Sequence, residues 1–361
     1  MARLTLASGK RKCFYGKLRQ DVQRQLVAAL RDQQQGVPIV GGRQTLAQFL
    51  EHWLIDVVKP AVRPRTYEAY HLNVRRLVPL IGRERLVGLT PAKIQAAYGT
   101  LLETGSSRSA KGLSRRSVEQ AHVVLHTALR YAVRSRVLAY NPADAVLAPR
   151  PDRQEMETLS VEQVQQLFDN TADDRWHALW VLLGTTGLRH GEATGLKWED
   201  LDLTTGQLTV RRSLQRQRGN GLVMVEPKTT RSRRTIHLTA AALAALRRHR
   251  VQQAEARLAA GPAWQERGLV FCTYAGGPLD PARINEAFHR ALDRAGLPRR
   301  RVHDLRHSVA SVLLALGVPV HDVSAILGHC QAAVTLNVYA HVTARGQAEA
   351  IQKLDALLVA R

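Results

Sequence analysis

The stretch RVHDLRHSVASVLLALG, residues 301–317, joins several basic side chains to a run apolar enough for a buried helix. Charged groups are rarely buried without a partner, so His303, Arg306 and His307 are expected to face one. His303 and Arg306 lie three residues apart on one helical face and could converge on a phosphate. Alternatively, His303 and His307 lie four apart with Asp304 after the first, close to the His-Glu-x-x-His pattern of zinc hydrolases.

A second segment with chemical potential is TTGLRHGEATGLKWEDLD, which contains Arg189 and Glu192. Glu192 comes three positions after Arg189, close enough on a helix to hold the guanidinium group, although a surface ion pair is the plain alternative. Lys228, in EPKTTRSRR at the end of a predicted strand, is the only lysine between Trp198 and Gln352. Lysine can give up a proton where arginine cannot, so this position favours proton chemistry over one more basic hairpin residue.

Two residues near the C-terminus complete a set. His329 follows Gly328, the expected end of a short helix, and Tyr339 falls in TLNVYAHV. Taken singly, they read as a surface histidine and a core or rim tyrosine. Jointly, two arginines, a lysine, two histidines and a tyrosine match the needs of nucleophilic attack on a phosphodiester. Arginines grip the non-bridging oxygens, the tyrosine oxygen attacks, and a base and an acid move the protons.

The composition indicates a polyanionic partner. The 361 residues include 52 Lys and Arg against 30 Asp and Glu, a formal net charge of +22. Solubility or the arginine preference of a GC-rich genome are weaker explanations, and nucleic acid is the favoured partner. Three scattered cysteines argue against a disulfide framework and a cysteine-based zinc site. The first residues lack the apolar core of a signal peptide and no apolar run reaches membrane-spanning length, so we expect a cytoplasmic protein with no membrane partner.

Apolar periodicity and linker composition predict a multidomain, mainly α chain. The expected parts are a module of a small β-sheet plus a helix at 1–40, a four-helix domain at 41–145, a linker at 146–157, and an α+β domain with a small antiparallel sheet at 158–361. The helix starts that we expect from capping residues are Thr45, Thr90, Ser114, and a capping box of Ser160 with Gln163. The strand-like runs are 206–214, 221–227, 233–238 and, as a possible fourth strand, 268–274.

At this point the motifs are recognisable. TTGLRHGEATGLKWEDLD, HDLRHSVASVLLALG, ILGH and TLNVYAHV, in this order, resemble the tyrosine recombinases, specifically phage-type integrases. The resemblance covers the whole of 158–361 as a catalytic domain. The helical domain is similar to their SAM-like core-site DNA-binding domain, and GKRKCFYGKLRQDVQRQL to their arm-site DNA-binding module. Such modules usually begin with another strand before the position of Leu4, so either the start is trimmed or the module is incomplete.

The resemblance implies a role for each site residue. Arg189 and Arg306 would clamp the scissile phosphate, and His329 would hydrogen-bond to it. Lys228 would be the general acid for the 5′ leaving oxygen, and His303 would assist proton transfer at the nucleophile. In addition, Glu192 would orient these groups without itself contacting the phosphate. Tyr339 would be the nucleophile that forms a 3′-phosphotyrosyl link.

The resemblance also implies the partners of the reaction. The chain would integrate or excise a mobile element, with double-stranded DNA carrying attachment and core sites as substrate and with no metal or nucleotide cofactor. It would act as a homotetramer in the nucleoid, with a host DNA-bending protein and an excision factor as possible helpers. The zinc-hydrolase reading is weakened because Arg306 would place a fixed positive charge beside the cation. A catalytically inactive, recombinase-like DNA-binding protein is the other alternative, and the presence of all six chemical residues argues against it.

Overall fold

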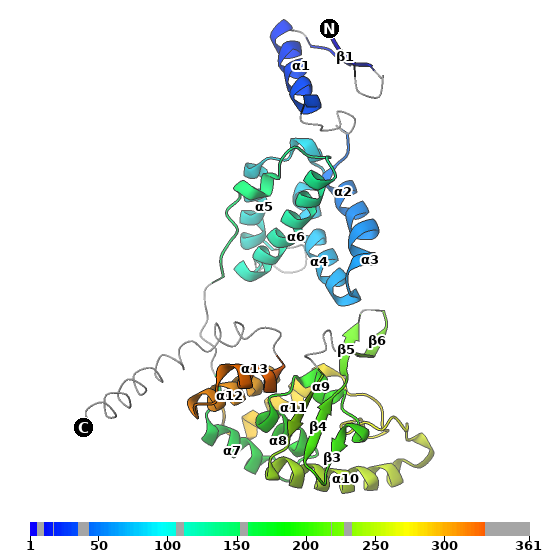
Figure 1. Ribbon diagram of the computed structural model, residues 1–361, viewed down its shortest axis with the longest axis vertical. Coiled ribbons are helices and arrows are strands. Elements are labelled where there is room, and N and C mark those ends of the chain that lie inside the picture. Colours follow the sequence, from blue (N-terminus) through cyan, green and yellow to red (C-terminus); the bar gives the residue numbers. More distant parts are fainter. Residues whose placement is uncertain are drawn as a thin grey trace, which may run out of the picture. The chain divides into compact units, whose positions relative to one another are not determined.

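The computed structural model divides the chain into two compact units, residues 1–154 and 155–361, each described by itself below (Figure 1). The residues that the structure describes are 1–5, 11–16, 18–34, 43–105, 112–151, 158–217, 219–226 and 233–328. Within these ranges, none of the helices combines the length and the apolar character that crossing a membrane would require.

The first unit begins with the predicted strand–strand–helix order. β1 (Ala2–Thr5) pairs antiparallel with β2 (Arg11–Phe14), with Ala2 opposite Phe14, and α1 (Arg19–Gln34) follows. Leu4 of the hairpin and Val22 of the helix are buried, and α1 packs against β1.

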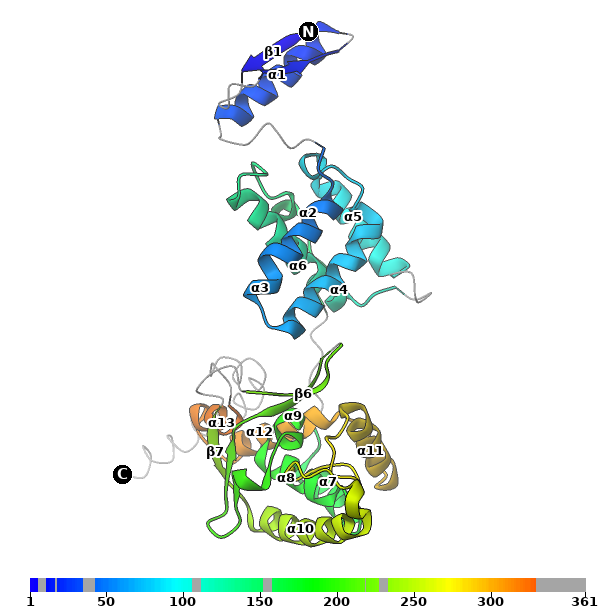
Figure 2. The same cartoon turned by 90° about the vertical axis from the view of Figure 1, so that its right-hand side faces the viewer.

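The rest of the described first unit is helical (Figure 2). Its segments group into four rods: one rod of three joined segments and three single helices. The first rod is continuous through three segments, because the residues at their junctions keep helical backbone angles. The predicted N-caps are confirmed: the Thr45, Thr90 and Ser114 side chains each accept a hydrogen bond from the backbone N–H three residues later. Each such cap stabilises its helix by about 1 kcal/mol. The bounds are α2 (Leu46–His52), η1 (Trp53–Val58) and α3 (Lys59–Ala61) for the first rod, then α4 (Pro64–Ile81), α5 (Pro91–Glu103) and α6 (Arg115–Arg134), with short 3-10 turns η2 (Leu86–Gly88) and η3 (Pro142–Ala145).

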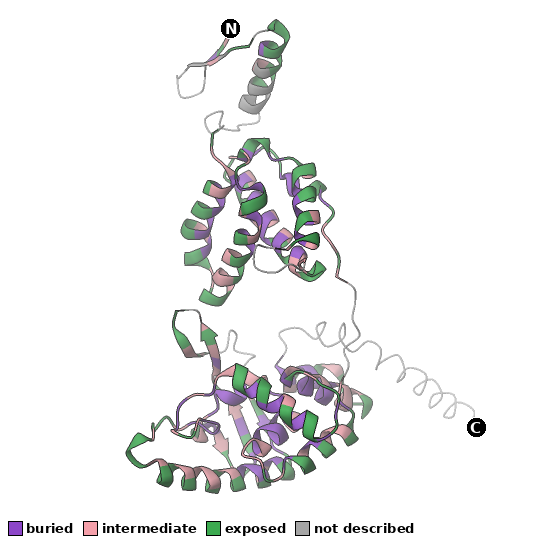
Figure 3. Cartoon of the chain, turned by 180° about the vertical axis from the view of Figure 1, so that it is seen from behind, coloured by how far each residue is buried: buried purple, intermediate pink, exposed green. Residues whose placement is uncertain are grey.

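The core of this helical bundle is formed by apolar side chains at helical spacing. Buried residues from every rod join one cluster, including Leu50, Leu77, Leu101 and Leu125. Figure 3 shows the buried residues gathered on the inward faces and the exposed ones outside. This pattern is the one that amphipathic helices of a small bundle produce.

The second unit is built around α8 (His177–Thr186), which is apolar on nearly every side. The capping box of Ser160 with Gln163 opens the unit as predicted. α8 packs against α10 and α12 and carries the buried Trp180, whose ring lies 5.0 Å from that of Phe288. The helices are α7 (Val161–Asn170), α8 (His177–Thr186), α9 (His190–Thr194), α10 (Ala240–Ala260), α11 (Pro281–Arg294), α12 (Val302–Ala315) and α13 (Val320–Leu327), with 3-10 turns η4 (Trp198–Asp200) and η6 (Gly261–Ala263).

Two small antiparallel sheets complete the second unit. β3 (Leu201–Asp202), β4 (Gln207–Val210) and β7 (Arg234–His237) form one sheet with β4 in the middle. β5 (Ser213–Gln217) and β6 (Gly221–Val225) form a separate hairpin that extends from the body of the unit in Figures 1 and 2.

The structure corrects two strand predictions. The run 206–214 is two strands, because Arg212 between them is anchored by Asp200 at 2.6 Å and by Glu199 at 2.9 Å, and the chain changes sheets there. The run 268–274 is not a strand; it makes only an isolated bridge between Lys197 and Leu269. Val270 and Phe271 of this run are buried in the core, and a short apolar run alone does not distinguish a strand from other buried backbone.

Candidate active site

The turn between α8 and α9 brings the first predicted site residue to the surface. Gly187 adopts φ of +63° and ends α8, a conformation that favours glycine. A Cβ atom at this position would also lie 2.6 Å from a methyl carbon of Leu327. Two residues later, Arg189 is the N-cap of α9, and its side chain remains 39% exposed. This guanidinium group therefore has access to a ligand from solvent.

Glu192 holds Arg189 as its spacing predicts. The carboxylate accepts hydrogen bonds from the backbone N–H of Arg189 at 3.0 Å and from its Nη1 at 2.8 Å. It also accepts two from Arg234, at 2.9 Å from Nη2 and 3.3 Å from Nη1. Burial alone raises the pKa of Glu192, but the hydrogen bonds and charges of Arg234 and Arg189 outweigh it and hold the pKa below its ordinary value. Glu192 is thus an ionised carboxylate shared by two arginines.

Arg234 is a site residue that the sequence analysis missed. It lies on β7, on the same face as the buried Ile236 because side chains alternate along a strand. Its side chain is only 7% exposed, and its Nε donates to the carbonyl oxygen of Ile326 at 2.7 Å. The sequence RRTIHL contained a signal for this role. Alternation along the strand places Arg234 on the inward face, where a buried charge requires a partner of opposite charge.

Gly328 lies against both arginines. It ends α13 with φ of +68°, and its carbonyl oxygen accepts a hydrogen bond from Nη2 of Arg189 at 3.1 Å. A Cβ atom at this position would lie 2.7 Å from Nη1 of Arg234, so a larger residue is excluded by the neighbour as well as by the backbone angle. The predicted helix end at Gly328 is confirmed, and the residue that precedes His329 is held by the Arg189 network.

Arg306 reaches the same turn from α12. Its side chain is almost fully buried, at 2% exposure, and its Nη1 donates to the carbonyl oxygen of Gly187 at 2.8 Å. Arg189 follows Gly187 by two residues. Two arginines that are 117 residues apart in the chain therefore meet at one turn, as the phosphate hypothesis requires.

His303 lies one helical turn before Arg306 and is uncharged at neutral pH. Burial lowers its pKa to about 4, together with the positive fields of His307, Arg306, His190 and Arg189. A histidine with this pKa is a neutral imidazole near pH 7, with one ring nitrogen that can accept a hydrogen bond. The same positive field that lowers its pKa favours a bound anion.

The zinc-hydrolase alternative loses the carboxylate that it requires. Asp304 is occupied by Arg301, which donates to it from the backbone N–H at 2.8 Å and from Nη2 at 2.8 Å. The His303 and His307 rings meet edge to face, with centroids 5.0 Å apart. Among the described residues, no group of three or more His, Cys, Asp or Glu side chains is arranged to hold a metal ion. The His303 and His307 side chains thus pack against each other along α12.

Three predicted site residues, Lys228, His329 and Tyr339, lie outside the described residues, and so does the segment after Gly328. Their assignments stay predictions. The structure brings together Arg189, Glu192 and Arg306, and adds Arg234.

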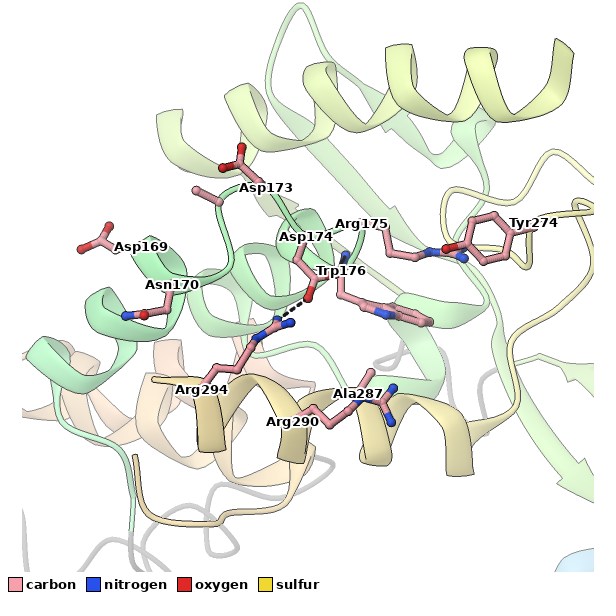
Figure 4. A pocket seen from close by; sticks show the side chains of 11 residues that line it. Asp169, Asn170, Asp173, Asp174, Arg175, Trp176, Tyr274, Ala287, Arg290 and Arg294 are labelled. Carbon is pink, nitrogen blue, oxygen red and sulfur yellow. Dashed lines mark hydrogen bonds and ion pairs between the residues drawn. The ribbon is translucent and has the colours of Figure 1, made fainter. Parts of the chain in front are cut away.

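A pocket of about 680 Å³ lies elsewhere in the second unit, between the end of α7 and α11 (Figure 4). None of the predicted site residues that the structure describes lines it. Two of its charged side chains have partners within the lining: Asp174 pairs with Arg294 at 2.6 Å, and the Arg175 guanidinium group lies 3.9 Å from the centre of the Tyr274 ring. We assign it no role in the chemistry.

Comparison with known proteins gives a consistent picture. Residues 157–345 match the model of the Phage integrase family, and residues 45–102 match Phage integrase, N-terminal SAM-like domain. The chain is 31% identical to a protein named Tyrosine recombinase XerC-like from Caldanaerobacter subterraneus, over 97% of this chain and 92% of the relative.

Solved structures share the fold. The Tn1549 transposon integrase in complex with transposon right end DNA matches with a TM-score of 0.74 at 21% identity, over 86% of this chain and 99% of that one. A lambda integrase tetramer bound to a Holliday junction matches with a TM-score of 0.57 at 16% identity, over 90% and 91% of the two chains.

Proposed function

Since the chain belongs to the phage integrase family and is a tyrosine-type site-specific recombinase, we propose that Tyr339 attacks the scissile phosphate of a core-site DNA strand. The tyrosine Oη–phosphorus bond forms, and the bond from phosphorus to the 5′ oxygen breaks. The products are a 3′-phosphotyrosyl link and a free 5′ hydroxyl. Attack by the 5′ hydroxyl of the partner strand reverses these bond changes and rejoins the DNA, integrating or excising a mobile element.

The phosphate clamp is formed by Arg189 and Arg306. The observation that carries the proposal is their convergence: Arg306 binds the carbonyl oxygen of Gly187, and Arg189 follows in the same turn. A guanidinium group can donate two parallel hydrogen bonds to phosphate oxygens, and its charge stabilises the negative charge that builds up during attack. His329 follows Gly328, whose carbonyl oxygen is hydrogen-bonded to Arg189, and adds a hydrogen bond to the phosphate.

Two groups move the protons. His303, kept neutral by its surroundings, accepts the proton of the Tyr339 hydroxyl. Lys228 delivers a proton to the 5′ oxygen as that oxygen leaves. Glu192 acts by orienting Arg189, to which it is hydrogen-bonded through both the backbone N–H and the guanidinium group.

DNA is the substrate, and the assembly is a tetramer on two duplexes. This proposal is supported by the match to a lambda integrase tetramer bound to a Holliday junction and by the net charge of +22. The helical domain at 41–145 binds the core site, residues 146–157 link it to the catalytic domain, and residues 1–40 bind arm sites. A DNA-bending protein of the host and an excision factor would assist, and the protein would act in the nucleoid.

Removal of residues 1–40 is expected to impair integration on full attachment sites while core-site binding and cleavage stay intact. The described part of this module is a separate hairpin and helix, and residues 1–36 carry eight Lys and Arg against two Asp. Gel-shift titration at several salt concentrations should show that the truncated chain releases fewer counterions on full sites than the intact chain. Equal integration by both chains would show that the module does not bind arm sites.

Strand cleavage is expected to continue in EDTA. Arg189 and Arg306 supply the positive charge that a divalent cation provides in metal-dependent nucleases. Cleavage of a core-site duplex would be measured with and without the chelator, alongside metal analysis of the purified protein. Loss of cleavage in EDTA together with one zinc per chain would contradict this and revive His303 and His307 as ligands.

A further inference from the structure

The buried carboxylate of Glu192 creates an electrostatic problem for phosphate binding. It lies 2.8 Å from Nη1 of Arg189, and an ion pair at this distance cancels much of the field that the guanidinium group projects. A carboxylate that orients Arg189 would by itself also weaken the attraction of Arg189 for phosphate, because the Arg189–Glu192 pair has no net charge.

Arg234 removes this difficulty. It binds the same carboxylate with a second guanidinium group, whose Nη2 lies 2.9 Å from Oε2 and whose Nη1 lies 3.3 Å from Oε1, while Arg189 Nη1 binds Oε1 at 2.8 Å. Two guanidinium groups and one carboxylate leave a net charge of +1. Both members of the Arg234–Glu192 pair are nearly buried, whereas Arg189 is 39% exposed, so the surplus charge is presented at the open side of the group.

The contacts of Arg234 fix it in this position. Its Nε donates to the carbonyl oxygen of Ile326 at 2.7 Å, and its guanidinium group fills the space that a side chain at Gly328 would occupy. Its backbone belongs to β7, in register with Val210 of β4. Contacts with Ile326, Gly328 and Glu192 therefore fix the Arg234 guanidinium group, which is buried against the Glu192 carboxylate and can balance its charge.

We propose that Arg234 is a positioning residue that serves as the fixed counter-charge of Glu192, so that Glu192 orients Arg189 without neutralising it toward the scissile phosphate. This inference rests on the proposed function, because it assumes that Arg189 binds that phosphate. Arg234 couples the strand that follows Lys228 in the chain to the carboxyl end of α13, just before His329.

The test measures the rate of covalent adduct formation on a nicked core-site duplex whose sequence is taken from the junctions of the encoding element. Arg234→Gln keeps hydrogen-bond donors and removes the charge, and we expect it to be slower by about 10–100-fold, as is typical when a residue that orients a ligating group is lost. Arg234→Lys, which keeps the charge but loses the paired geometry, is expected to retain more activity than Arg234→Gln. A lysine variant as slow as the glutamine variant would contradict the charge role.

The cleavage rate of a double variant distinguishes a charge-balancing role of Arg234 from a merely structural one. Adding Glu192→Gln to Arg234→Gln removes both opposite charges and returns a net charge of +1 to Arg189. We expect the double variant to cleave about tenfold faster than Arg234→Gln. Because it leaves no buried carboxylate that has lost one of its two arginines, it should fold even if Arg234→Gln does not, and it should then stay within about tenfold of the wild-type rate. A double variant as slow as, or slower than, Arg234→Gln would overturn the inference.

Arg233→Gln is the matched control. Arg233 precedes Arg234 in the chain, but its side chain is 61% exposed and pairs with the exposed Glu226, so wild-type rates are expected. Melting temperature and core-site affinity establish that each variant folds and binds. If wild-type protein forms adduct and Arg234→Gln matches it, the inference fails alone. If wild-type protein forms no adduct, the proposed function fails with it.

Discussion

A Tyr339→Phe variant is expected to bind core-site DNA with wild-type affinity and to form no covalent adduct. The change removes one oxygen atom, the proposed nucleophile, and leaves a ring of nearly the same shape. A duplex nicked next to the cleavage point would lose its short 5′ fragment after attack and trap the wild-type enzyme on a 3′ end. Denaturing gels would then show the adduct for the wild-type enzyme and none for the variant.

Tyr274→Phe is the control for that experiment. Tyr274 is the only other tyrosine in residues 158–361, and its ring covers the guanidinium group of Arg175 instead of approaching Arg189 or Arg306. Adduct formation by Tyr274→Phe should match wild type. If Tyr339→Phe still forms the adduct, the assignment of the nucleophile is wrong.

A Lys228→Ala variant is expected to lose about 10²–10⁴-fold in cleavage rate, the range that general acid catalysis contributes. Lys228→Arg distinguishes the two roles that a basic residue could have there. Arginine binds phosphate at least as well as lysine but cannot release a proton, so a general acid predicts that Arg fails nearly as badly as Ala. A phosphate-binding role predicts that Arg keeps most of the activity.

Sulfur at the 5′ bridging position of the substrate should restore cleavage by Lys228→Ala, because a thiolate leaves without a proton. Arg189→Ala and Arg306→Ala should gain nothing from the sulfur, since they act on the non-bridging oxygens. Single-turnover rates on the two substrates would measure the rescue. Failure of sulfur to rescue Lys228→Ala would make the lysine structural or phosphate-binding, and His329 would become the first candidate for the proton donor.

Helix starts in this chain were predictable because they depend on local chemistry. Thr45, Thr90 and Ser114 cap helices since their hydroxyl groups satisfy backbone N–H groups a few residues away, whatever the rest of the fold does. The Arg189–Glu192 pair is local in the same way, because its members are three positions apart and both lie at the start of one short helix. Gly328 was predictable as a helix end because a left-handed residue is needed there.

The remaining features depend on partners that are distant in the chain. The division of 206–214 into two strands follows from Arg212 binding Asp200 and Glu199, which no periodicity reports. Arg234 became a site residue only when β7 was placed beside Glu192, 42 positions earlier. The convergence of Arg306 on Gly187 spans 119 positions. In these cases the residue type is visible in the sequence, but its partner is supplied by the tertiary fold.

The apolar cores of the helical bundle and of the second unit have no residue in common within the described ranges. A substitution in one of these cores removes packing contacts from that core and leaves the packing of the other unchanged. If the bundle reads the core site, as proposed, its sequence can change without repacking the core that holds Arg189, Arg234 and Arg306 in place. Natural selection could then vary the target sequence and the cleavage reaction of one chain separately.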